Sequence, residues 1–210
     1  MPRSTTPEAV KPPRGRPRSR EADDAILWAS LELLTERGYG GLTMAGIATK
    51  AGVGKATLYR RWKSREEVLA AAVASFVEGE IQIPDTGSLE GDLHLLMERA
   101  VRTYRGRPGR VMPGLLAAMS ESATVARAVR TRFLAGRRQA LAVVIERGTA
   151  RGELAADVDV ELALDFLGGP LFYRLLVTGA PLDAALIDGV VDTMLHGLPK
   201  PTTEDPEEES

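Results

Sequence analysis

The 210 residues of the chain can form one or two compact units. Hydrophobic residues make up 44% of them but aromatics only 5%, and this Ala-, Leu- and Val-rich composition favours an all-α fold. The absence of cysteine excludes disulfides, thiol nucleophiles and thiolate zinc sites. The net charge of −2 combines +7 over residues 1–65 with −9 over residues 66–210, so we expect a polyanion to meet the amino-terminal part.

The first 20 residues are rich in Pro and Arg and almost free of large apolar side chains, which predicts a disordered basic arm. Within it, Arg14-Gly15-Arg16-Pro17-Arg18 is similar to the core of an AT-hook, in which Arg14, Arg16 and Arg18 would lie along an A·T-rich minor groove. A basic arm that touches phosphates without sequence preference is the alternative, and both readings stay open.

Four helices are predicted next, over residues 21–82. The first runs from Glu21, with apolar side chains at helical spacing, to a terminating Gly38. Two short helices follow, the first capped by Thr43. The fourth begins at Ser64, which is spaced with Glu67 as a capping box. A turn over residues 84–87 then marks the junction between a head, residues 21–82, and a body, residues 83–198.

The body is predicted to be helical over residues 88–105, 108–119, 122–151, from Asp157 or Asp159 to 176, and 182–196. Gly168, Gly169 and Pro170 interrupt the fourth of these segments, so we expect a kink there and the close approach of a partner helix. Residues 199–210 form an acidic tail that we expect to be disordered and solvated.

The two short helices of the head are spaced as a helix-turn-helix. This motif needs a small residue where the helices cross, a glycine in the turn, and apolar residues that hold the crossing angle. Ala48 and Gly52 fit the first two roles, and Leu58 and Trp62 lie one turn apart on the second helix. Its outward face carries donors and small groups rather than acids.

The stretch from Gly38 to Leu69, GYGGLTMAGIATKAGVGKATLYRRWKSREEVL, closely resembles the DNA-binding head of the TetR family. Trp62 replaces the usual Phe and remains an apolar side chain that fills the core. Arg65 replaces the usual Lys and remains a cation suited to phosphate. The resemblance implies that Thr43 and Tyr59 position phosphates, that Arg65 grips the DNA backbone, and that Lys55, Ala56 and Thr57 enter the major groove. The full predicted DNA-binding set is Thr43, Met44, Lys55, Ala56, Thr57, Tyr59, Arg60, Arg61, Lys63 and Arg65.

The same resemblance implies a helical body that holds a small-molecule effector and forms a homodimer through its last two helices, over residues 160–176 and 182–196. Those helices are more apolar than one monomer core requires. Adaptable and aromatic side chains are candidates for the effector pocket, although each one alone also suits ordinary core packing. They are Met97, Tyr104, Met112, Met119, Phe133, Phe166 and Tyr173.

The predicted function is therefore that of a sequence-specific transcriptional regulator, a repressor released from a double-stranded operator by an effector. No dinucleotide-binding, P-loop, GxSxG or HExxH motif occurs, so we expect neither an enzyme nor a cofactor. His94 and His196 are read as ordinary helix residues, and no metal site is expected. No apolar run is long enough to span a membrane, so a cytoplasmic protein is expected. A ligand-independent architectural DNA-binding protein is the alternative.

Overall fold

The computed structural model describes residues 17–75, 82–155 and 157–197. All regular structure in these ranges is helical, as the composition predicts. The head contains α1 (Pro17–Arg37), α2 (Met44–Lys50), α3 (Lys55–Tyr59) and α4 (Arg65–Ser75). The body contains α5 (Leu89–Arg105), α6 (Arg107–Glu121), α7 (Ala123–Ala128), the π-helix η1 (Val129–Leu134), α8 (Ala135–Ala150), α9 (Val160–Tyr173), the π-helix η2 (Arg174–Thr178) and α10 (Ala184–His196).

Helix α1 is the core helix of the head and packs against α2, α4 and α6. It begins at Pro17, four residues before the predicted start at Glu21. Proline is compatible with the first turn of a helix because the backbone N–H that it lacks would have no partner there. The predicted arm therefore ends earlier, and Arg18 lies in the first turn of α1, where its backbone is helical rather than extended. Arg14 and Arg16 lie outside the described residues. Gly38 ends the helix with a φ of +66°, as predicted.

The predicted caps of α2 and α4 are present. The Thr43 hydroxyl accepts a 3.0 Å hydrogen bond from the Gly46 N–H, and the Ser64 hydroxyl accepts one of 3.3 Å from the Glu67 N–H. In a standard capping box the glutamate returns to the N–H of the capping residue. Here Glu67 instead accepts from the Lys63 N–H at 2.7 Å.

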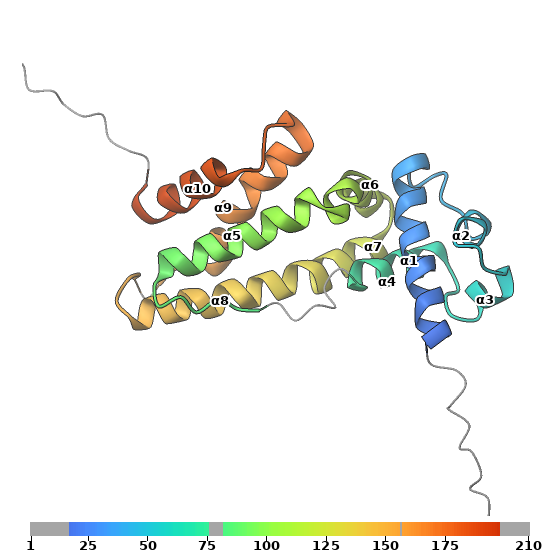
Figure 1. The fold of residues 1–210 in the computed structure, drawn as a ribbon, viewed down its shortest axis with the longest axis horizontal. Helices are drawn as coiled ribbons and strands as arrows, with labels where there is room; N and C mark the ends of the chain where they lie inside the picture. Colours follow the sequence, from blue (N-terminus) through green and yellow to red (C-terminus); the bar gives the residue numbers. More distant parts are fainter. Residues whose placement is uncertain (1–16, 76–81, 156, 198–210) are drawn as a thin grey trace, which may run out of the picture.

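The body is an elongated bundle in which two long helical units lie side by side (Figure 1). One is α5. The other is residues 123–150, where α7, η1 and α8 follow one another without a break, and we call this unit the rod. Helix α9 packs against α8, and α10 packs against α5 and α9. The far end of the rod is the end most distant from the head.

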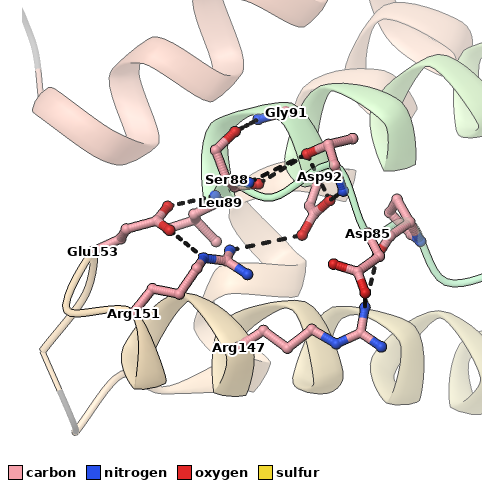
Figure 2. Close-up of polar contacts among 10 residues, drawn as sticks. Asp85, Ser88, Leu89, Gly91, Asp92, Arg147, Arg151 and Glu153 are labelled. Atoms are coloured by element: carbon pink, nitrogen blue, oxygen red, sulfur yellow. Dashed lines mark hydrogen bonds and ion pairs between the residues drawn. The ribbon is translucent and has the colours of Figure 1, made fainter.

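A buried carboxylate ties α5 to the far end of the rod (Figure 2). Asp92 has no exposed surface, and its Oδ1 accepts hydrogen bonds from the Thr86 N–H at 2.7 Å and the Thr86 hydroxyl at 2.8 Å. Its Oδ2 lies 3.8 Å from Nη2 of Arg151. Arg151 also pairs with Glu153, which accepts from the Leu89 N–H at the start of α5. The start of α5 is thereby held against the end of α8.

Helix α9 continues through the Gly168-Gly169-Pro170 sequence, where a kink is predicted. The irregular backbone comes later, in η2, and ends at Gly179 with a φ of +65°. The acidic tail lies outside the described residues.

Candidate DNA interface and ligand cavity

The helix-turn-helix has the packing that the sequence predicts. Gly52 has a φ of +66° in the turn between α2 and α3, a conformation that favours glycine. The Val53 N–H donates to the Ala48 carbonyl at 3.0 Å. Ala48 and Leu58 are buried at the crossing, and Trp62 is partly buried against the same core.

The opposite face of α3 is open. Lys55, Ala56, Tyr59 and Arg60 are exposed, and the Tyr59 side chain keeps 52% of its surface accessible. Thr57 is half-buried beside them. This face offers cations, a phenol and two small side chains, which are groups that contact phosphates and base edges.

The remaining predicted DNA-binding residues differ in their exposure to solvent and in their contacts within the head. Thr43 and Lys63 are exposed, and Met44 is half-buried. Arg61 is largely buried and forms an ion pair with Asp23 of α1, so it faces the head's own core helix rather than outward.

Arg65, which is predicted to bind the DNA backbone, forms hydrogen bonds within the head. Its Nη1 donates to the carbonyls of Tyr39 at 2.9 Å and Leu42 at 2.8 Å. Its Nε donates to Glu66 at 3.0 Å, and the guanidinium lies 4.2 Å from the centroid of the Tyr39 ring. In this structure Arg65 joins the turn after α1 to the start of α4, and a contact with DNA stays a prediction.

Glu66 completes this junction. Burial raises the pKa of its carboxyl, but hydrogen bonds from the Tyr39 hydroxyl at 2.7 Å, from the backbone, Ser64 and Arg65 outweigh burial and bring the pKa to about 2. The carboxylate is therefore charged at neutral pH. For Tyr39, burial and the contact with Glu66 raise the pKa, so its phenol stays protonated and keeps donating.

A cavity of about 770 Å³ lies in the body. Its walls come from α5, α8 and α9, with Leu134 of η1 and Gln82 at the margin. The volume is within the range of sites that enclose drug-sized ligands. The apolar lining consists of Leu96, Met97, Ala100, Leu134, Ala140, Leu141, Leu164, Leu167, Leu171 and Phe172, and the polar and charged lining of Gln82, Arg99, Arg102, Thr103, Tyr104, Arg137, Arg138, Glu161 and Asp165.

Of the seven predicted pocket residues, only Met97 and Tyr104 line this cavity. Met112 and Phe133 are buried in the core, and Met119 packs partly buried against it. Their aromatic side chains predict a pocket position for Phe166 and Tyr173. In the structure both are on the exposed side of α9, with 51% and 59% of their surfaces accessible.

Arg137 is a charged cavity residue that is absent from the predicted pocket set. It lies four residues after Phe133 and four before Leu141, so it occupies an apolar position in the helical repeat of the rod. A charged residue in such a series was the signal that could have identified it.

None of the helices in residues 17–75, 82–155 and 157–197 is both long and apolar enough to cross a membrane. The same residues contain no group of three or more His, Cys, Asp or Glu side chains placed to hold a metal ion.

Comparisons with known proteins agree with this geometry. Residues 26–72 match the family described as bacterial regulatory proteins, tetR family, and residues 83–194 match the tetracyclin repressor-like C-terminal domain. The chain is 34% identical over 185 residues to the uncharacterized HTH-type transcriptional regulator YdeS of Bacillus subtilis, covering 88% of this chain and 93% of that one. It is 33% identical over 192 residues to the DNA-binding transcriptional repressor TetR of Mycobacteroides abscessus, covering 90% and 97%.

Among solved structures, the TetR family transcription regulator SCO0332 is similar, with a TM-score of 0.64 and 31% identity over 86% of this chain and 100% of that one. Both halves of the chain thus match the family in sequence, and the helix-turn-helix and helical body match it in structure. The chain belongs to the TetR family of DNA-binding transcriptional regulators.

Proposed function

We propose that this regulator binds its operator as a homodimer, as a repressor, and that a small molecule in the cavity of the body releases it. The observation that carries the proposal is that one continuous helical unit, the rod, both contacts the head and lines the cavity. The rod contacts α4 of the head through α7 and η1, and α8 forms a wall of the cavity.

The exposed face of α3 supports the DNA contact. We propose that Lys55, Ala56 and Thr57 meet base edges in the major groove, while Tyr59 and Arg60 meet phosphates. We assign Thr43, Met44, Lys63 and Arg65 to the flanking backbone contacts. The Arg61 ion pair with Asp23 favours a positioning role for that residue, since it holds α3 against α1.

We propose the domain division that the sequence predicts, with the arm shortened: a basic arm before α1, a head to residue 82, a body over 83–198 and an acidic tail. The separate family matches at residues 26–72 and 83–194 support it. In the arm, Arg14 and Arg16 remain candidates for minor-groove contacts. As a regulator of genes, the protein would act in the cytoplasm without catalysing a reaction.

An apolar stripe on α9 and η2 supports homodimerisation. Leu162, Phe166 and Tyr173 are exposed large apolar side chains of α9, spaced four and seven residues apart and hence on one face of that helix. Exposed Leu176 and Val177 of η2 continue the stripe along the chain. Exposed Gly169 lies between Phe166 and Tyr173, where a partner helix could approach closely. A second copy would bury this stripe against its own, as symmetric dimers do.

Release requires that the effector bind one arrangement of the two heads better than the other. Helix α4 supports such coupling because it packs on both α1 of the head and the rod. A ligand that displaced α8 would displace η1 and α7 with it, and hence α4 and the spacing between the heads.

The test is selection of bound duplexes from a random library by the full chain, followed by fluorescence anisotropy on the selected operator. We expect saturable, sequence-selective binding by a dimer, and loss of binding when a metabolite screen reaches the effector. Binding that is indifferent to DNA sequence would support the architectural alternative instead. A chain that binds no duplex at low salt would overturn the proposal.

A further inference from the structure

Arg137 is a cation of the cavity wall for which the described residues supply no carboxylate partner. Arg137 is partly buried, and Nη1 donates to the Phe133 carbonyl of its own helix at 2.9 Å. Its guanidinium lies 3.8 Å from the centroid of the Phe133 ring and 5.9 Å from that of Tyr104. Within the described part of the chain, no Asp or Glu forms an ion pair with it. Burial lowers the pKa of this guanidinium, against the opposing effect of Tyr104.

The adjacent arginine is different. Arg138 also lines the cavity, but it is exposed and its Nη2 lies 2.8 Å from Oε2 of Glu161 on α9. Of the other two cavity arginines, Arg102 is exposed to solvent, and Arg99 donates a hydrogen bond to the Gln82 carbonyl. Among the described cavity arginines, Arg137 is therefore the partly buried one whose guanidinium lies against aromatic rings without a carboxylate partner.

An uncompensated charge beside apolar side chains is unfavourable unless a counter-charge binds there. A guanidinium binds carboxylates in a two-pronged geometry and retains N–H donors beyond the one used on Phe133. Tyr104 offers a second donor. Burial raises its pKa more than the neighbouring Arg137 lowers it, so the phenol remains protonated.

We propose that the effector is an amphiphilic acid, with a single carboxylate that pairs with Arg137 and an apolar alkyl or aromatic body that packs on Leu141, Leu164 and Phe172. This inference rests on the proposed function, because it names the ligand class of the same cavity.

The experiment is isothermal titration of the full chain with four acids, octanoate, decanoate, dodecanoate and 1-naphthylacetate, each compared with its primary amide. The amide keeps the shape of the acid and removes the charge. A charge-assisted hydrogen bond is worth enough to make the best acid bind about 10- to 100-fold more tightly than its amide. Equal binding of acid and amide, or no saturable binding by any of the four acids, overturns the proposal.

Arg137→Gln should abolish the preference for acid over amide, and Arg137→Lys should retain part of it. Arg138→Gln is the matched control, because Arg138 is the adjacent arginine and already pairs with Glu161, and this variant should keep the full preference. A preference that survives in Arg137→Gln would overturn the assignment. The comparison of acid with amide on the wild-type protein needs no variant, so a misfolded variant leaves the test intact.

Operator binding, measured on the same preparations, separates the two proposals. If the operator is bound and an uncharged compound releases it while no acid does, the inference about the carboxylate fails and the proposed function stands. If no operator is bound, the proposed function fails.

Discussion

The Tyr39 hydroxyl donates a 2.7 Å hydrogen bond to Oε1 of Glu66, which joins the turn after α1 to the first turn of α4. Arg65 strengthens this junction through its contacts with the Tyr39 ring and carbonyl. Since α4 also packs on α7 and η1, the junction lies on the path between the helix-turn-helix and the body. It is a structural feature whose contribution can be measured through pH.

Glu66 is expected to stabilise the fold at neutral pH and to lose this effect as the pH falls from about 4.5 to about 2. Its pKa is lower in the folded chain than the ordinary value of 4.5, so the folded state binds fewer protons. The stabilisation is thus complete above pH 4.5 and disappears as the folded carboxylate is protonated. Thermal unfolding from pH 2 to 6 should show a shallower pH dependence in Glu66→Gln than in the wild type.

Tyr39→Phe removes one of the hydrogen bonds that lower the Glu66 pKa. We expect the carboxyl to titrate closer to 4.5 in this variant, which can be followed by NMR of the Glu66 side chain. An unchanged titration curve would show that Tyr39 does not set this pKa.

Lys55→Ala should weaken binding to the selected operator by about 1–3 kcal/mol if Lys55 contacts a guanine, and should relax base preference at one position. Lys50→Ala is the control, since Lys50 on α2 is exposed but paired with Glu36 at 2.7 Å. The measurement is anisotropy on the operator and on single-base variants. An equal loss for all sequences would indicate that Lys55 contacts phosphate instead.

Asp92→Ala should destabilise the chain by about 1–3 kcal/mol, because it removes two hydrogen bonds from Thr86 to a buried charged acceptor and the ion pair with Arg151. Glu90→Ala, at an exposed position in the same first turn, should change stability by less than about 0.5 kcal/mol. Urea unfolding followed by circular dichroism measures both. Similar midpoints for the two variants would contradict a role for the buried carboxylate.

Phe166→Asp should convert a dimer into a monomer, since it places a charge in the middle of the apolar stripe. Ala117→Asp, at an exposed position on α6, provides the control and should leave the dimer intact. Sedimentation velocity distinguishes the two masses. A dimeric Phe166→Asp protein would move the interface away from the stripe.

The head could be predicted almost completely because its signals are local. The Thr43 cap, the Gly38 terminator and the Ala48 and Gly52 pair each depend on residues within a few positions of one another, and all occur as expected. The helices of the body could be predicted as well, but only Met97 and Tyr104 of the predicted pocket residues line the cavity. Side-chain type alone cannot tell the exposed face of α9, with Phe166, from its buried face, with Leu167.

The roles of Arg61 and Arg65 also depended on information outside the local sequence. Each pairs with a group from another helix or turn, Asp23 for Arg61 and the Tyr39 and Leu42 carbonyls for Arg65. The local sequence around α3 and the start of α4 predicts outward-facing cations because it contains no information about the neighbouring helix or turn. The same lack of tertiary context hid Arg137, whose significance depends on the facing wall formed by α9.

The rod carries its contact with α4, made by α7 and η1, and its share of the cavity wall, made by α8, on one continuous helical unit. Each α-helical residue advances the side-chain direction by about 100°, so the loss of one residue from α8 before Arg137 would turn Arg137 away from its present side of the helix while α7 kept its place against α4. The i→i+5 bonding of η1 accommodates one residue more than an α-helical turn does, so a deletion within residues 129–134 can restore a regular α-helix. We therefore expect single-residue deletions in the first turn of α8 to uncouple the ligand from the head more severely than deletions in η1.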